Sequence, residues 1–124
     1  MSGFIIKFIK SFSNAARGIA YLFKSQTNAR IELIIASIVV ISGILFKISS
    51  VEWLIILLCI ALVLGFEGIN TALEIFADKL HPGFDEEIGK AKDVAAGAVL
   101  ITAVVATIIG FVIFAPHLQY LFIH

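Results

Sequence analysis

The stretch from Val94 to Ala115, VAAGAVLITAVVATIIGFVIFA, contains no charged residue and is apolar along its whole length. A helix needs about 20 apolar residues to cross the hydrocarbon core of a bilayer. Lipid offers no hydrogen-bond partners to a backbone, so a spanning segment must satisfy its own polar groups as a helix. Strands of a membrane barrel would be shorter and would alternate in polarity. The stretch therefore predicts a transmembrane helix.

Two more spans are expected upstream. Residues 31–46, IELIIASIVVISGILF, are interrupted only by Glu32, and residues 53–66, WLIILLCIALVLGF, are apolar before a more polar continuation. The whole chain is 60% hydrophobic and 15% charged, whereas soluble domains average about half apolar and a quarter charged. We therefore predict an all-α membrane protein with three transmembrane helices.

The chain is expected to form a single domain, residues 1–124. In this prediction, helices at about 29–48, 51–80 and 91–116 contain the spans, and residues 1–28 form a separate helix before them. Apolar residues recur in this N-terminal segment at helical spacing, with basic and polar residues largely between them: Phe4, Ile5, Phe8, Ile9 and Phe12 against Lys7, Lys10, Asn14 and Arg17. Such a pattern is typical of an amphipathic helix that lies in the headgroup region.

The basic residues predict the orientation of the spans. Most of them precede the first span or lie between the second and third: Lys7, Lys10, Arg17, Lys24, Arg30, Lys79, Lys90 and Lys92. Only Lys47 lies between the first two spans, and none follows the third. By the positive-inside rule, the N-terminus and the 79–93 loop are cytoplasmic and the C-terminus is outside. The formal net charge of zero does not favour a nucleic-acid partner.

Polar residues form a stripe on the cytoplasmic half of the second span. At about 100° per residue, Glu67, Asn70, Glu74 and Asp78 share one narrow helix face. A solvated helix end would explain Asp78, but Glu67 lies about 21 Å along the helix from Trp53. Ionisable residues at such depth are costly and usually face a functional cavity. A deep carboxylate could act as a general base, and a shallower one could meet a metal-bound phosphate.

Several interpretations of these polar residues remain open from spacing alone. Lys92, at the cytoplasmic start of the third span, could neutralise phosphate oxygens or simply extend to the interface. A small ion-conducting oligomer lined by Glu67, Glu74 and Asp78 is a non-enzyme alternative. Such a channel would need polar residues along the entire span, and residues 53–66 lack them. A purely structural subunit would leave Glu67 without a purpose.

Two linked motifs resemble the prokaryotic diacylglycerol kinase family, which also includes undecaprenol kinases. They are residues 67–74, EGINTALE, and residues 92–99, KDVAAGAV. The resemblance covers nearly the whole chain and includes residues 28–31, NARI. It implies a homotrimer in the bacterial cytoplasmic membrane, with composite active sites between subunits. It also implies Mg²⁺ as cofactor and ATP as co-substrate.

The reaction implied by the resemblance is transfer of the ATP γ-phosphoryl group to diacylglycerol, which gives phosphatidic acid. The alternative is an undecaprenol kinase that makes undecaprenyl phosphate, and nothing in the sequence decides between the two. By resemblance, Glu67 is the catalytic base and Glu74 is a ligand to the magnesium on ATP. Asn70 is its neighbour in the active site, and Lys92 and Asp93 contact the nucleotide.

Three N-terminal residues complete the implied site. Lys7 and Asn14 fall at nucleotide-contacting positions, although their residue types differ from those of the best-known member. Gln26 stands where the family often has a glutamate that is the second metal ligand. An amide oxygen can still coordinate magnesium, but it adds no charge. By resemblance, Glu74 and Gln26 are therefore expected to hold the metal, either with weakened metal affinity or with Gln26 acting through a water molecule.

Overall fold

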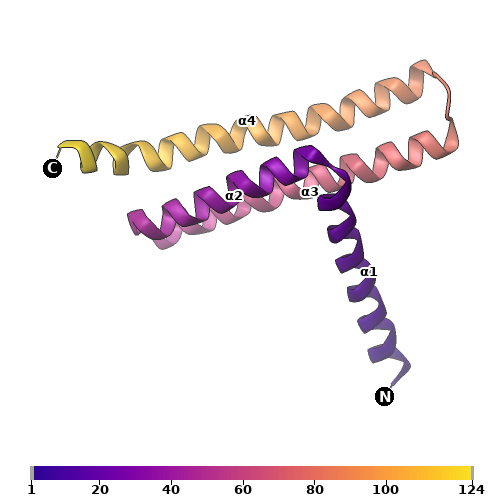
Figure 1. Ribbon diagram of the computed structural model, residues 1–124, viewed down its shortest axis with the longest axis horizontal. Helices are drawn as coiled ribbons and strands as arrows, with labels where there is room; N and C mark the ends of the chain where they lie inside the picture. Colours follow the sequence, from indigo (N-terminus) through magenta and orange to yellow (C-terminus); the bar gives the residue numbers. More distant parts are fainter. Residues whose placement is uncertain (1, 124) are drawn as a thin grey trace.

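The computed structural model describes residues 2–123, and every regular element in that range is a helix. The helices are α1 (Gly3–Ser25), α2 (Thr27–Phe46), α3 (Ser50–Leu80) and α4 (Glu86–Ile123). Helices α2, α3 and α4 run alongside one another, and α1 leaves this bundle at a steep angle (Figure 1). The predicted all-α architecture with a separate N-terminal helix is confirmed for these residues.

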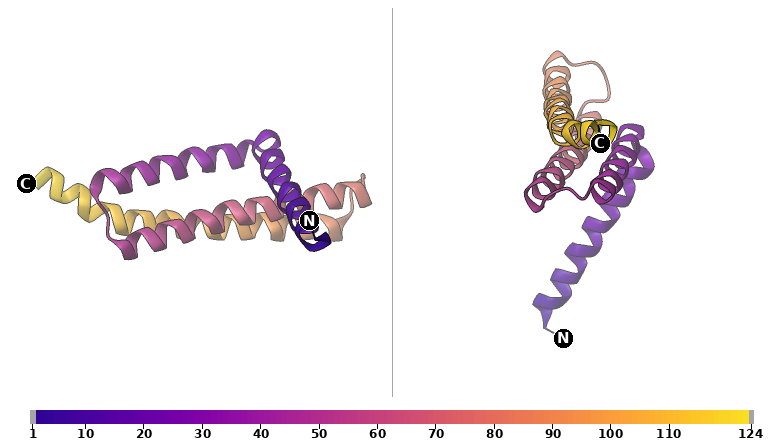
Figure 2. Two further views of the ribbon diagram at one scale, coloured as in Figure 1. Left: turned by 90° about the horizontal axis from the view of Figure 1, so that it is seen from below. Right: turned by 90° about the vertical axis from the view of Figure 1, so that its left-hand side faces the viewer.

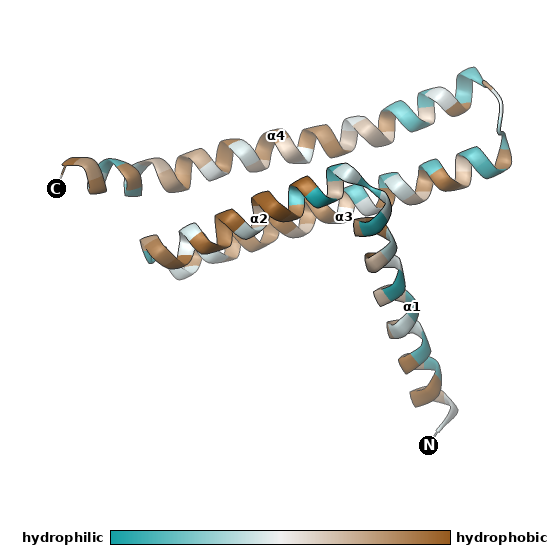
Figure 3. Ribbon diagram, in the orientation of Figure 1, coloured by the Kyte–Doolittle hydropathy of each residue, from teal (hydrophilic) through white to brown (hydrophobic). Residues whose placement is uncertain are grey.

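Helices α2, α3 and α4 are each long and apolar enough to cross a membrane. Apolar residues cover most of their surface, and the polar residues gather near the ends of the bundle and along α1 (Figure 3). Many large apolar side chains on these helices are exposed, such as Leu45, Leu58 and Phe111. Soluble proteins rarely expose apolar patches of this extent. The predicted number of candidate spans, three, is therefore confirmed.

The apolar core lies at the end of the bundle away from α1. Ile48, Ile56 and Ile113 are buried there, and Phe46 and Trp53 pack against them. Helix α4 packs antiparallel along α3 over much of its length, while α2 contacts α3 less extensively. Seen along the bundle, the three helices lie at the corners of a triangle (Figure 2). The core thus fastens all three spans together at one end.

A short, well-capped turn makes α2 and α3 antiparallel neighbours. Lys47 adopts a left-handed backbone conformation (φ 52°), and the N–H of Ile48 donates to the Gly43 carbonyl oxygen (3.2 Å). Ser49 and Glu52 then form a capping box at the start of α3, with reciprocal bonds of 3.0 and 3.2 Å. Both helix ends are therefore satisfied locally, as helix ends at a membrane surface require.

Gly43 permits a close approach between α2 and the Trp53 ring. A Cβ at position 43 would lie 2.8 Å from Trp53 Cη2 and 3.0 Å from Ile48 Cδ1. We therefore expect Gly43→Ala to destabilise the protein by roughly 1–3 kcal/mol, the usual cost of overpacking a core. The measurement is the thermal unfolding midpoint in detergent. Gly110→Ala is the matched control, because nothing lies within 4 Å of a Cβ there; equal midpoints for the two variants would contradict the prediction.

Helix α4 extends at both ends beyond the expected 91–116. It begins at Glu86, because the side chain of Asp85 accepts from the N–H of Ile88 (3.0 Å) and caps the helix start. It also continues past Pro116 to Ile123. A proline removes one backbone hydrogen-bond donor and weakens the helix at that point. The next residue, His117, contacts Glu52 of α3 (Nε2 to Oε2, 3.3 Å), and this contact holds the C-terminal part of α4 against α3.

Candidate active site

Polar residues are buried in the middle of α3, where the sequence predicts the functional stripe. Glu67, Asn70 and Thr71 are 3%, 8% and 4% exposed. The hydroxyl of Thr71 donates to the backbone carbonyl oxygen of Glu67 (2.9 Å), so the helix itself satisfies it. No side chain among residues 2–123 is hydrogen-bonded to the Glu67 carboxylate. The Glu67 side chain is therefore buried in the protein without a hydrogen-bonding side-chain partner among these residues.

Two oxygens near this carboxylate are buried without a partner. Asn70 Oδ1 and Glu32 Oε2 form no hydrogen bond with residues 2–123. Leaving a buried polar group without a hydrogen bond costs about 1–3 kcal/mol. Such a group in a native protein therefore usually bonds to a water, an ion, a ligand or another chain. Glu32 comes from α2 and interacts electrostatically with Glu67. The sequence analysis did not include Glu32 among the site residues. A charged residue inside an apolar run could have pointed to it.

The shallower part of the stripe meets α4. Lys92 Nζ forms an ion pair with Asp78 across the α3–α4 turn and also interacts electrostatically with Glu74. The structure therefore brings Lys92 to the α3 stripe, while its neighbour Asp93 is exposed. The Asp78 side chain is 67% exposed. Exposed pairs of this kind contribute little to stability, so Lys92 could exchange Asp78 for a phosphate at small cost.

The N-terminal candidates stand apart from this stripe within one chain. Lys7 and Asn14 are exposed on α1, whose N-terminal part projects away from the bundle (Figure 1). Asn14 Oδ1 accepts from Arg17 Nη2 (2.9 Å). Gln26 is half-buried between α1 and α2, and its amide nitrogen donates to Ser25 Oγ (3.5 Å). Its amide oxygen therefore stays available as a ligand.

Glu74 and Gln26 carry donor atoms suited to magnesium, but the described part of the chain builds no complete metal cage. Within residues 2–123, no three Asp, Glu, His or Cys side chains gather closely enough to hold an ion. Magnesium usually keeps several waters and binds through one or two carboxylates together with substrate phosphates. The half-buried Glu74 carboxylate and the Gln26 amide oxygen are donor types that such an open site uses.

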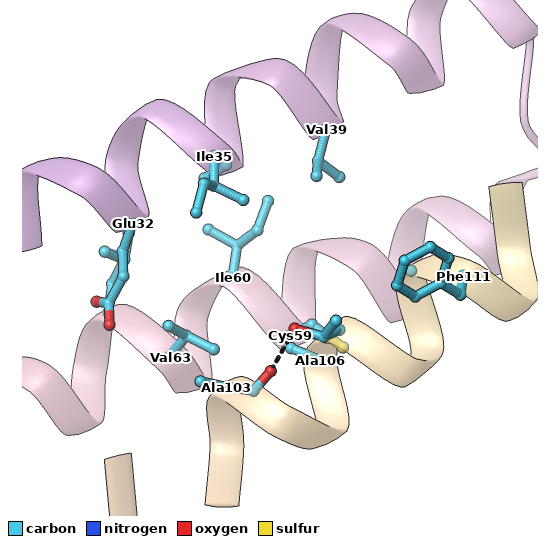
Figure 4. A pocket seen from close by; sticks show the side chains of 13 residues that line it. Glu32, Ile35, Val39, Cys59, Ile60, Val63, Ala103, Ala106 and Phe111 are labelled. Carbon is cyan, nitrogen blue, oxygen red and sulfur yellow. Dashed lines mark hydrogen bonds between the residues drawn. The ribbon is translucent and has the colours of Figure 1, made fainter. Parts of the chain in front are cut away.

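An apolar cleft of about 410 Å³ lies between α2, α3 and α4. Glu32 stands at one end and Phe111 at the other (Figure 4). The rest of the lining is apolar or small: Ile35, Ala36, Val39, Cys59, Ile60, Val63, Leu64, Ala103, Ala106, Thr107 and Gly110. The Thr107 hydroxyl donates to the Ala103 carbonyl oxygen (2.8 Å) and offers no free donor. Such a cleft suits an apolar chain whose polar group lies at the Glu32 end.

The sequence is similar to those of known lipid kinases. Residues 13–114 match the family described as prokaryotic diacylglycerol kinase. An undecaprenol kinase of Bacillus subtilis (strain 168) is 41% identical over 117 residues, which cover 90% of this chain and 91% of that protein. A diacylglycerol kinase of Synechocystis sp. is 36% identical over 109 residues, 87% of this chain and 62% of that protein. The diacylglycerol kinase of Escherichia coli (strain K12) is 23% identical over 111 residues, with 90% and 91% coverage.

Proposed function

Because this chain belongs to the prokaryotic diacylglycerol kinase family, and is therefore an ATP-dependent lipid kinase of a bacterial membrane, we propose that its lipid substrate is undecaprenol. The 41% identity to an undecaprenol kinase over nine-tenths of both chains supports this choice. Similarity to the two diacylglycerol kinases is lower, at 36% and 23%. Diacylglycerol, the first expectation from the sequence, becomes the second candidate. An ion-conducting oligomer receives no support from these relatives.

The single structural observation that carries the proposal is the polarity of the cleft. Its lining places a carboxylate, Glu32, at one end, and along the rest the Thr107 hydroxyl is bonded to its own helix and the free thiol of Cys59 is only a weak donor. A polyprenol has one terminal hydroxyl and a long hydrocarbon chain, so it needs polar partners only at that end. Diacylglycerol also carries two ester groups, whose desolvation without partners would be unfavourable. The cleft therefore favours the polyprenol.

The proposed reaction is direct phosphoryl transfer. The Glu67 carboxylate takes the proton of the lipid hydroxyl, and the resulting oxygen attacks the γ-phosphorus of ATP. The new O–P bond forms as the bond to the β–γ bridging oxygen breaks, and ADP leaves. Such a reaction depends mainly on positioning and charge stabilisation. Lys92 would offset charge on the β- and γ-phosphates, and Asn70 would orient groups next to Glu67.

Mg²⁺ would be held by Glu74 and Gln26 together with phosphate oxygens and water. When bound, it neutralises the charge that develops on the phosphates during transfer. Asp93 is proposed to contact the nucleotide from the exposed start of α4. These roles follow the family resemblance, and the donor types and the proximity of Lys92 to Glu74 support them.

We further propose that the active unit is a homotrimer. Lys7 and Asn14 belong to α1, which projects away from the other three helices (Figure 2), so a neighbouring subunit would bring the two parts of the nucleotide site together. The α1 side chains of Phe4, Phe8 and Phe12 are 66–78% exposed. An interfacial position for α1 on the cytoplasmic face would place them in lipid. The C-terminus would then lie outside.

The experiment that tests the substrate is radiolabel transfer from ATP to purified protein supplied with undecaprenol or diacylglycerol in the same detergent. We expect kcat/KM to be at least about tenfold higher for undecaprenol, which corresponds to about 1.4 kcal/mol of discrimination. Phosphorylation of diacylglycerol with an equal or higher kcat/KM would overturn the proposed substrate.

Filling the cleft should weaken binding of the lipid alone. Ala106 lines the cleft from α4, so Ala106→Phe should raise KM for undecaprenol by about tenfold, in line with the usual cost of overpacking. KM for Mg-ATP should stay unchanged. The adjacent Val105 is 48% exposed and does not line the cleft, so Val105→Phe is the matched control. Equal kinetics for the two variants would exclude the cleft as the lipid site.

A further inference from the structure

The two N-terminal helices are joined by one residue. Helix α1 ends at Ser25, α2 begins at Thr27, and Gln26 between them has an extended backbone (φ −111°, ψ 114°). The chain therefore turns sharply, as Figure 1 shows. A helix end leaves its last carbonyl oxygens without intrahelical partners. At this junction, the carbonyl oxygens of Phe23 and Lys24 need donors from elsewhere.

Arg30, one turn into α2, supplies those donors. Its Nη1 donates to the carbonyl oxygens of Phe23 (2.9 Å) and Lys24 (2.7 Å). Its Nη2 donates to the Thr27 hydroxyl (3.1 Å). The planar guanidinium can hold several acceptors in one fixed geometry, and its positive charge favours a helix C-terminus. Arg30 thereby ties the last turn of α1 to the first turn of α2.

A second contact fixes the other side of α1. Leu22 packs toward a small residue of α3, since a Cβ at Gly68 would lie 3.6 Å from Leu22 Cδ2. Gly68 directly follows Glu67 in the sequence. The angle of α1 is therefore held between the Arg30 contacts on α2 and the Leu22 contact beside the buried carboxylate. Rotation about Gln26 would disturb both.

We propose that Arg30 is a positioning residue for the nucleotide side of the reaction. By fixing the α1–α2 angle, it sets where Gln26 and the α1 residues Lys7 and Asn14 stand relative to the phosphates. This inference rests on the proposed function, which gives those residues their nucleotide-side roles. The cleft is lined by residues of α2, α3 and α4 and by none of α1. Loss of Arg30 therefore weakens Mg-ATP binding and spares lipid binding.

The kinetic test compares Arg30→Lys and Arg30→Gln. Lysine keeps the positive charge but lacks the planar guanidinium that bonds to three acceptors at once. Glutamine loses the positive charge and has a shorter side chain. We expect KM for Mg-ATP to rise roughly tenfold in Arg30→Gln, as the loss of charge-assisted hydrogen bonds implies, and less in Arg30→Lys. KM for undecaprenol should change less than about twofold. Lys24→Gln is the matched control: it removes a positive charge at the same junction but keeps the carbonyl acceptor.

A distance measurement separates positioning from general damage to the protein. Spin labels at positions 9 on α1 and 41 on α2, both exposed, are introduced after Cys59→Ser, and labelled protein is diluted with unlabelled protein. Arg30→Gln should broaden the distance distribution, and Lys24→Gln should not. An unchanged distribution, or equal rises of the two KM values, would overturn the inference. Failure of the unsubstituted protein to phosphorylate undecaprenol would instead overturn the proposed function, and the distances would still decide whether Arg30 fixes the junction.

Discussion

Replacing Glu67 with glutamine is expected to lower kcat by about 10³-fold, the middle of the range that a positioned general base contributes. Glutamine has nearly the same shape as glutamate but cannot take the proton of the lipid hydroxyl. The side chain is 3% exposed, so bulk water has little access to replace it as the base. The measurement is kcat at saturating undecaprenol and Mg-ATP, with product identified by chromatography.

Stability separates a chemical role of Glu67 from a structural one. Glutamine removes a buried ionisable group and adds no volume, so the unfolding midpoint should be unchanged or higher. Glu87→Gln, which neutralises an exposed carboxylate paired only with Lys90, is the matched control and should keep full activity. A Glu67→Gln protein that retains kcat within tenfold of the unsubstituted enzyme would remove Glu67 from the role of base.

Replacing Glu74 with alanine is expected to raise the free Mg²⁺ concentration for half-maximal activity by about 100-fold. Loss of outer-shell partners alone typically costs 10–100-fold in metal affinity, and Glu74 is proposed to be a direct ligand. Its proximity to Lys92 places it where a metal–phosphate complex would meet α4. The measurement is the initial rate against free Mg²⁺ at saturating undecaprenol.

Gln26→Glu is the companion variant to Glu74→Ala. It adds a second negative ligand at the α1–α2 junction, so the Mg²⁺ requirement should fall. The Mg²⁺ concentration for half-maximal activity should therefore rise in Glu74→Ala and fall in Gln26→Glu. A general loss of folding could not produce these opposite changes. A Mg²⁺ dependence that is unchanged in Glu74→Ala would refute the metal role of this residue.

Much of the architecture could be predicted because lipid imposes strong rules on sequence. A spanning helix must be long and apolar, so residues 31–46, 53–66 and 94–115 already marked the three spans. The same rule made Glu67 conspicuous, since a charge at that depth requires a reason. Helical spacing then placed Asn70 beside it, and the structure buries both.

The remaining features depend on contacts between helices, which spacing within one helix does not reveal. Glu32 joins the site only because α2 packs beside the middle of α3, and its position at the cleft follows from that packing. The pairing of Lys92 with Asp78 depends on the α3–α4 turn. The contacts of Arg30 depend on a one-residue junction whose backbone conformation no pattern of hydrophobicity predicts.

The distribution of the core has a mechanical consequence. The clustered side chains around Ile48, Ile56 and Ile113, together with the Glu52–His117 contact, all lie toward one end of the bundle. Glu32 and Glu67 lie nearer to the opposite end, where α1 joins α2. The contacts that hold the three spans together are therefore separate from the residues assigned to the reaction. Substitutions at Glu32 or Glu67 should leave those contacts intact.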